Sequence, residues 1–82
     1  MITDMAAEQH LEEANRILLE AERRRDKAIL ICRELSELGA APDELDAAKE
    51  ELYAAASAVG VAAKEQRIWS QTVATIERHR QG

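Results

Sequence analysis

The sequence predicts an all-α protein: an antiparallel two-helix hairpin, coiled-coil-like, with an alanine-rich seam. In the first half, alanines recur every seven residues and a second stripe interleaves with them, giving the alternating steps of three and four that keep one helix face on a partner. The second half repeats this spacing, and Gly39 and the only proline, Pro42, stand between the halves. The stripes are Ala7, Ala14, Ala21, Ala28 and Leu35 with Leu11, Leu18, Arg25 and Cys32, then Leu45, Leu52, Val59, Gln66 and Val73 with Ala48, Ala55, Ala62, Trp69 and Ile76.

The first helix should span about residues 4–38, since Gly39 supplies the left-handed conformation that commonly ends a helix. The turn should occupy residues 39–42. Pro42 suits the first turn of a helix, because its missing N–H needs no partner there, and the second helix should run over about 42–79.

In such a hairpin, residues that face each other have numbers adding to a constant, and the value 80 sets small residues against large ones. Small against large is the complementarity that a close-packed layer needs. The predicted pairs include Ala28 with Leu52, Ala21 with Val59, and Leu18 with Ala62.

Composition limits the class of protein. Residues 1–82 form one domain at most, and a chain of this length has difficulty burying enough surface without staples or partners. A net charge of −5 argues against a general nucleic-acid binder, because phosphate contacts need clustered Lys and Arg. The sequence shows no membrane span, and its single cysteine fits a reducing compartment, so we expect a cytoplasmic protein.

Gly60 lies inside the second helix, where glycine costs about 1 kcal/mol relative to alanine. One explanation is a break that makes three helices of the two. The other is a close contact, because Ala56, Gly60 and Ala63 lie one helical turn apart beside the seam. A helix that is small and apolar nearly all round has several neighbours, which favours two hairpins dimerising into a four-helix bundle.

A second signal for association is the run Ile29, Leu30 and Ile31 in the first helix. Together with its neighbours it is apolar around the whole helix circumference, and exposed apolar clusters usually mark interfaces. It serves either the core of a homo-oligomer or a surface for a different protein partner. Trp69 is either a core anchor at the open end or a binding hot spot, and the hydroxyl of Tyr53 could cap an interface.

The residues that carry chemistry do not assemble into a site. His10 and His79 lie too far apart in this register to share a metal, and neither is preceded three residues earlier by Glu. Cys32 fits the seam as a small buried hydrophobe. We therefore expect no enzyme and assign no catalytic, metal or cofactor-binding residue.

The outline resembles two kinds of helical hairpin. Secreted WXG-type hairpins are similar in size but carry Trp-x-Gly in the turn, where this chain has Gly39-Ala40-Ala41-Pro42. Plasmid RNA-binding hairpin dimers are similar in architecture but display a basic face that this chain lacks. No family is assigned on these grounds.

The function expected is a non-enzymatic protein–protein interaction module that acts through self-association and a helical binding surface. Two alternatives stay open. One is a small acidic inhibitor or mimic, of the phage or mobile-element type, that binds a host protein or nucleoprotein complex. The other is an RNA-binding hairpin dimer that uses Arg16, Arg23, Lys27 and Arg67.

Overall fold

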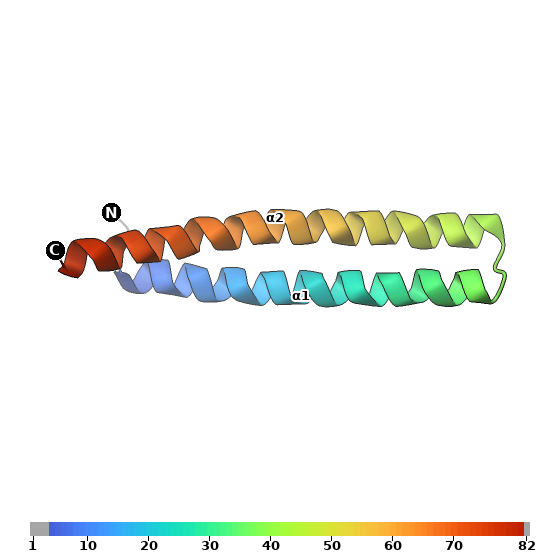
Figure 1. The fold of residues 1–82 in the computed structure, drawn as a ribbon, viewed down its shortest axis with the longest axis horizontal. Coiled ribbons are helices and arrows are strands. Elements are labelled where there is room, and N and C mark those ends of the chain that lie inside the picture. Colours follow the sequence, from blue (N-terminus) through green and yellow to red (C-terminus); the bar gives the residue numbers. More distant parts are fainter. Residues whose placement is uncertain (1–3, 82) are drawn as a thin grey trace.

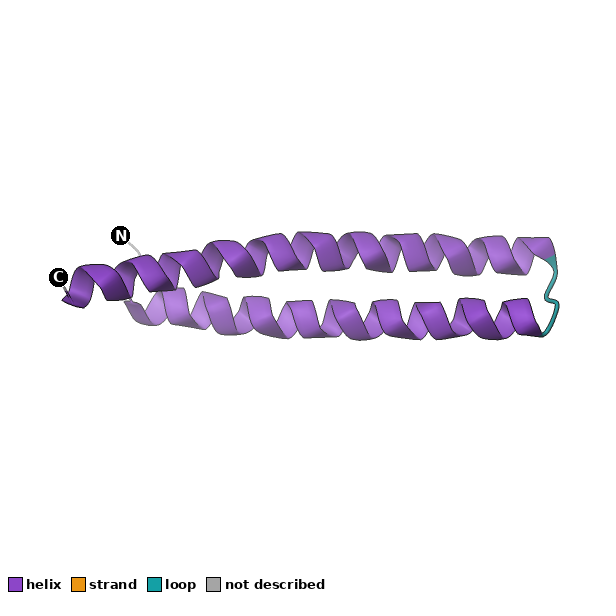
Figure 2. Ribbon diagram, in the orientation of Figure 1, coloured by secondary structure: helices purple, strands orange, loops and turns teal. Residues whose placement is uncertain are grey.

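The computed structural model describes residues 4–81, and these form two α-helices, α1 (Asp4–Glu37) and α2 (Pro42–Gln81). The helices lie side by side and join by a short turn at one end, so they run antiparallel (Figure 1). Within the described residues the chain is helix apart from that turn (Figure 2). The hairpin is a rod of 61 × 16 × 15 Å. The all-helical hairpin predicted from the heptad spacing is confirmed.

The end of α1 is fixed by its glycine. Gly39 has a φ of 68°, the left-handed conformation that side chains disfavour. Its N–H donates to the carbonyl of Ser36 at 3.2 Å, and the N–H of Ala40 donates to the carbonyl of Leu35 at 3.0 Å. These two bonds are the Schellman pattern, which satisfies carbonyls that a helix end would otherwise leave without partners. The predicted role of Gly39 is confirmed.

The helix limits differ slightly from those predicted. We expected the first helix to reach residue 38, and α1 ends at Glu37, although the N–H of Leu38 still donates to the carbonyl of Glu34 at 3.0 Å. The second helix reaches residue 81 rather than 79. Differences of one or two residues are the usual spread at helix ends, because the last turn continues some of the helical bonds.

The start of α2 has a favourable residue, proline, at its first helical position and an unfavourable one, alanine, at its N-cap position. Pro42 occupies the first helical position, and the carbonyl of Ala41 accepts the first bond, from the N–H of Leu45 at 3.1 Å. Asp43 and Glu44 place negative charge in the first turn, which the helix dipole favours. Ala41 stands at the N-cap position but has no side-chain oxygen to accept a bond from the free N–H groups.

The seam lies where the heptad spacing places it. Among the described residues, six hydrophobic side chains are buried and all of them are alanine: Ala7, Ala14, Ala21, Ala28, Ala55 and Ala62. Every other predicted seam residue is half-buried. Alanine lets the two helix backbones approach closely, so the interior is thin and holds no fully buried large side chain.

Two contacts between the helices report the register. The rings of His10 and Trp69 are stacked with centroids 4.3 Å apart, and the guanidinium of Arg24 meets the carboxylate of Glu51. The numbers of His10 and Trp69 add to 79, which suits a hairpin in which facing residues have numbers adding to about 80. Those of Arg24 and Glu51 add to 75, so the two side chains reach about 7 Å along the axis to meet. A slip of one heptad would separate the rings of His10 and Trp69 by about 10 Å along the axis. The individual facing pairs, such as Ala28 with Leu52, stay predictions.

The second helix is not broken at its glycine. Helix α2 continues from Pro42 to Gln81 through Gly60, so the three-helix alternative is wrong. The i to i+4 hydrogen bonds on either side hold Gly60 in helical conformation. The glycine therefore lowers the stability of the helix without interrupting it. No side chain of the hairpin occupies the space that a Cβ at Gly60 would take.

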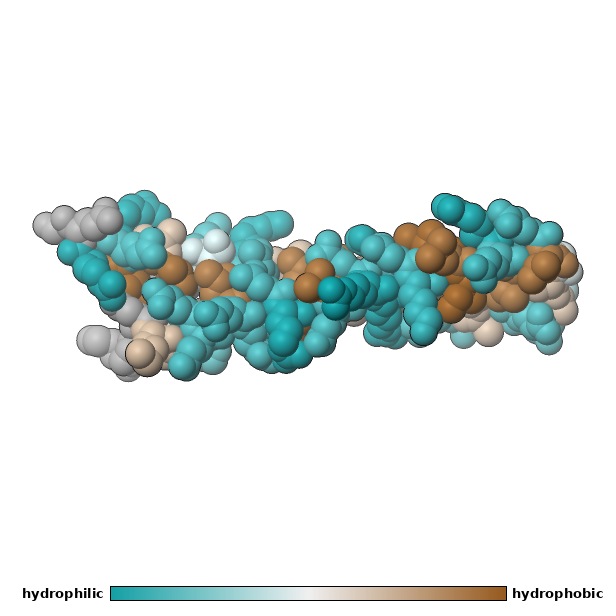
Figure 3. Space-filling view, turned by 90° about the horizontal axis from the view of Figure 1, so that it is seen from below, coloured by the Kyte–Doolittle hydropathy of each residue, from teal (hydrophilic) through white to brown (hydrophobic). Residues whose placement is uncertain are grey.

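The outer surface alternates between apolar and hydrophilic patches. Viewed from the α1 side, apolar side chains gather in patches separated by hydrophilic ones, with a large patch towards the turn (Figure 3). Neither described helix contains an apolar stretch long enough to cross a membrane.

We predict that Ala41→Ser raises the free energy of unfolding by about 1 kcal/mol, because a serine oxygen at the N-cap position can accept a bond from the first turn. Glu44, three residues later, can return a bond to the N–H of residue 41, which completes a capping box. Chemical denaturation followed by circular dichroism measures the change. Ala47→Ser, inside the same helix, is the control and should not stabilise the protein. Equal effects of the two substitutions would contradict the capping argument.

Candidate functional site

The seam divides the surface of the hairpin into two sides. On the Arg24 side, named for the pair that bridges the helices there, lie Ile17, Arg24 and Ile31 of α1 with Glu51, Ala58 and Val61 of α2. On the Tyr53 side lie Leu19 and Ile29 of α1 with Tyr53, Ala56, Gly60 and Ala63 of α2. Successive residues of a helix are 100° apart, which assigns each residue to its side once the seam is known.

The apolar run of α1, residues 29–31, is exposed to solvent in three directions. The exposed fractions are 38% for Ile29, 53% for Leu30 and 40% for Ile31. Ile29 and Ile31 are 200° apart on the helix, so they flank the seam on opposite sides, and Leu30 points away from α2. The three side chains of this run therefore point in different directions, and no single flat partner can contact all of them.

The predicted interface residues of α2 share one side. Tyr53 is 68% exposed, Ala56 and Gly60 are exposed, and Ala63 is half-buried, all on the Tyr53 side. An added Cβ at Gly60 would meet no atom within 4 Å. The hairpin itself therefore gives no reason for a glycine at this position, and the space above it is open.

Trp69, unlike the other candidate interface residues, makes specific side-chain contacts within the hairpin. Its ring stacks on His10 with an interplanar angle of 15°, and its indole N–H donates to the carboxylate of Glu65 at 3.1 Å. Stacked aromatic pairs add about 0.5–1.5 kcal/mol beyond the area that they bury. These contacts favour the interpretation of Trp69 as an anchor at the open end of the hairpin.

Sequence reasoning missed one feature, an apolar groove of about 610 Å³ on the Arg24 side. Seven residues line it: Ile17, Ala54, Ser57, Ala58, Val61, Ala62 and Glu65. The small residues of α2 in it are visible in the sequence, but the groove also needs Ile17 of α1 as its opposite wall. Ile17 is 44% exposed and Val61 is 69% exposed, so both walls meet solvent.

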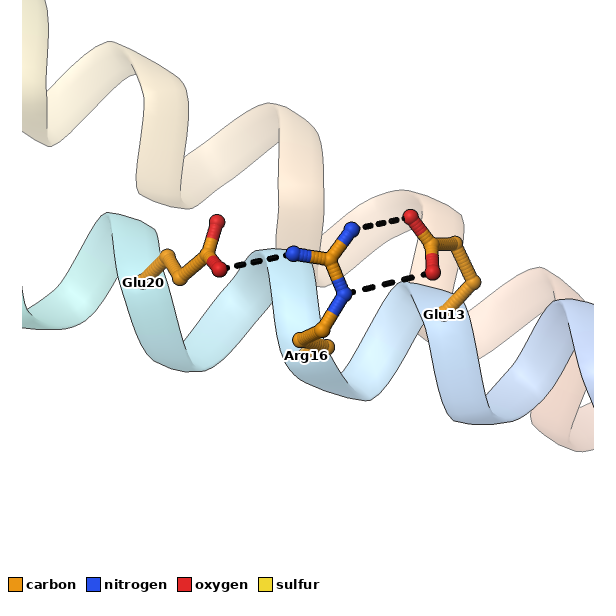
Figure 4. A network of polar contacts seen from close by, with 3 residues as sticks. All are labelled: Glu13, Arg16 and Glu20. Carbon is orange, nitrogen blue, oxygen red and sulfur yellow. Dashed lines mark hydrogen bonds and ion pairs between the residues drawn. The ribbon is translucent and has the colours of Figure 1, made fainter.

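The charged residues form pairs mainly on α1 and on the Arg24 side. The guanidinium of Arg16 lies between Glu13 and Glu20 on the surface of α1 (Figure 4). A hydrogen bond from Arg16 lowers the pKa of the Glu13 carboxyl, and the same bond raises the pKa of Arg16. These groups are solvent-exposed, so their ion pairs add little to the free energy of unfolding. Their main effect is that the charge of Arg16 is balanced by the two carboxylates beside it.

The pair that joins the helices is formed by Arg24 and Glu51. Two nitrogens of the guanidinium donate to the two carboxylate oxygens, at 2.6 and 3.1 Å. This bidentate bond lowers the pKa of Glu51 and raises that of Arg24. Because the pair spans α1 and α2, it favours one register of the hairpin.

Of the four basic residues named for the RNA-binding alternative, Arg16 alone has an ion pair among the described residues, so that alternative stays a prediction. Arg16 is shared by two carboxylates, Arg24 is bonded to Glu51, and Arg25 is bonded to Asp26 at 3.1 Å. A guanidinium that is already neutralised attracts phosphate less.

The described residues form no cluster of metal ligands. Across residues 4–81, no three His, Cys, Asp or Glu side chains gather as metal ligands, and Cys32 is a half-buried free thiol in the seam. Comparison with family models, with curated proteins and with solved structures gave no match to the chain. Any functional assignment therefore depends on the two sides of the hairpin.

We predict that Glu51→Gln lowers the melting temperature near neutral pH and that the difference from wild type shrinks on acidification. The folded-state pKa of Glu51 is lowered below its ordinary value of 4.5, so its stabilising effect is present above that value. The effect is lost as the pH falls through the folded-state pKa. Melting curves between neutral pH and pH of about 3 measure it. Glu50→Gln, whose carboxylate makes no ion pair among the described residues, is the control. A pH-independent difference would show that the charge pair plays no part.

Proposed function

We propose that the protein is a non-enzymatic interaction module that acts by self-association, most simply as a two-fold dimer of hairpins that forms a four-helix bundle. The observation that carries the proposal is the distribution of apolar side chains. Within residues 4–81 the buried hydrophobic residues are all alanine, while Leu19, Tyr53 and Val61 are 48%, 68% and 69% exposed. A chain whose large hydrophobic residues face outward on both sides gains stability by covering them.

The geometry of a hairpin explains why folding alone does not bury these residues. Two packed helices share one strip of contact, so each helix keeps most of its circumference in solvent. Small chains of this kind commonly depend on oligomerisation to bury enough surface. Four-helix bundles solve the problem by placing two hairpins face to face around a common core. A chain with one cysteine needs no oxidising compartment, and we infer a cytoplasmic location.

The acidic-inhibitor alternative has less support. Near the turn, Asp43 and Glu44 interact with the positive end of the α2 dipole, and Glu51 is bonded to Arg24. These acidic residues have roles within the hairpin, so they do not require a basic partner. A different protein on the apolar sides is the remaining alternative, and the state of the wild-type chain in solution distinguishes it from self-association.

We predict that the wild type sediments as a dimer or larger at micromolar concentration and that Gly60→Leu shifts it towards monomer while its helicity is kept. Leucine is a better helix former than glycine by about 0.8 kcal/mol, and the space beside Gly60 in one hairpin is open. Its side chain nevertheless obstructs the close approach of a second copy. Analytical ultracentrifugation and circular dichroism measure the two effects separately.

The matched control is Ser57→Leu, which adds the same side chain one turn earlier on α2 but outside the Tyr53 side. It should leave the dimer in place. A wild type that stays monomeric would overturn the proposal, and the exposed residues would then await a different protein. Dissociation by Ser57→Leu but not by Gly60→Leu would move the interface to the apolar groove.

A further inference from the structure

We propose that two copies associate through their Tyr53 sides with both turns at the same end, so that α1 of each copy lies against α2 of the other. This arrangement rests on the self-association proposed above and specifies its interface. The occupant of the Tyr53 side is thus a second copy of the same chain. The register of the hairpin and the charges that the hairpin leaves unpaired support this arrangement.

A two-fold axis along the rod fixes the height of every residue, by which we mean its distance from the turn along the rod. It leaves every residue at its own distance from the turn, so residues of α1 and of the second copy's α2 lie at the same height when their numbers add to about 80. Each helix then has antiparallel neighbours, as in an up-and-down four-helix bundle. No sliding of one copy along the other is compatible with this symmetry, so the charge pattern tests the arrangement directly.

The unpaired charges match at these heights. Glu12 and Arg67 have numbers that add to 79, and so do Arg33 and Asp46. Each pair is offset by one residue, about 1.5 Å along the axis. All four side chains are exposed, and within the described part of the chain none of them has an ion pair. A second copy in this arrangement supplies an opposite charge to each of them, twice per dimer.

The uncharged residues of the Tyr53 side fit the same heights. Leu19 is 48% exposed and lies level with the second copy's Gly60, where an added Cβ would meet no side chain of the other helix within 4 Å. A leucine side chain can fill that space only because residue 60 has none. Asp26 lies level with Tyr53, whose hydroxyl can donate to the carboxylate across the interface. The glycine inside α2 and the 68% exposure of Tyr53 then share one explanation.

Reversing one copy, so that the turns lie at opposite ends, can also match charges on the same side. When Glu12 lies level with the second copy's Arg33, Arg67 lies level with its Asp46, because Glu12 and Arg67 share one height and Arg33 and Asp46 share another. The reversed arrangement sets α1 against α1, however, so it does not bring Leu19 to the open space beside Gly60, and the uncharged residues favour aligned turns.

Using the Arg24 side with the turns together is also poorer. Glu13 then lies level with Glu65, and Glu34 with Glu44. The arginines on or near that side are already bonded, Arg16 to Glu13 and Arg24 to Glu51. The Tyr53 side with aligned turns is the arrangement in which opposite charges meet and Leu19 also lies level with Gly60.

The size of the Tyr53 side is sufficient for a stable dimer. Helix α1 is about 50 Å long and the rod is 16 Å wide, so one side presents roughly 800 Å². Standard protein interfaces bury about 800 Å² on each partner.

The test uses charge reversal and mixing. Glu12→Arg alone or Arg67→Glu alone puts like charges level in both copies of the pair, and each should weaken the dimer roughly tenfold or more. An equimolar mixture of the two variants should form a heterodimer of near wild-type affinity, because both pairs then have opposite charges. Sedimentation equilibrium measures the dimer dissociation constants, and circular dichroism follows any loss of helix that accompanies dissociation.

The controls are Glu50→Arg and Arg23→Glu, which make the same changes of net charge on the outward faces of α2 and α1. Neither should change the dissociation constant more than about twofold at moderate salt. If a single variant unfolds as it dissociates, the mixture should restore helix as well as dimer, which a folding defect in either chain would not allow. A mixture no tighter than its components overturns this arrangement.

A second variant tests the same arrangement without charge reversal. Glu22 lies level with the second copy's Ala56 and gains no opposite charge there, so association removes water from its carboxylate without compensation. Glu22→Gln should therefore tighten the dimer several-fold, and a weakened dimer would count against this arrangement. If the wild type dimerises and neither test succeeds, only the arrangement fails. A monomeric wild type refutes both this inference and the proposed function.

Discussion

The close approach of two backbones over an alanine seam is the constraint on which the rest of the structure depends. Alanines such as Ala14 and Ala55 bring the helices together, so the larger seam residues, such as Leu18 and Leu52, are only half-buried. Other large apolar side chains, among them those of Leu19 and Tyr53, lie outside the seam and are exposed. The same choice that makes the hairpin thin leaves its sides apolar, so the internal packing and the capacity to associate have one cause.

The sequence predicted the fold well because the relevant information is local. Heptad spacing specifies which face of a helix is buried, and Gly39 and Pro42 specify where one helix ends and the next begins. Both follow from properties of neighbouring residues on one helix. The extra residues at the end of α2 were missed because helix ends are stabilised by weak terms that no single residue decides.

The candidate site was less predictable because it depends on how side chains of different helices meet. The sequence placed Trp69 in the seam, but its stacking on His10 depends on a neighbour of the seam reaching across. The groove needs Ile17 from the opposite helix, and the bond between Arg24 and Glu51 needs side chains long enough to span two helices. The sequence indicated that the run from Ile29 to Ile31 is apolar around the helix, but the exposures of 38% for Ile29 and 40% for Ile31 depend on how α1 packs against α2.

The single tight turn also has a consequence for the order of folding. Arg24 and Glu51 are 27 residues apart in sequence, and the separation of His10 and Trp69 is more than twice as large. Each doubling of a closed loop costs about 0.6 kcal/mol of chain entropy, so contacts near Gly39 form with the smallest loss. The hairpin should therefore zip from the turn towards the termini. Native-state hydrogen exchange would be slowest beside the turn and fastest at the open end, where the stacking of Trp69 on His10 is the last contact to form.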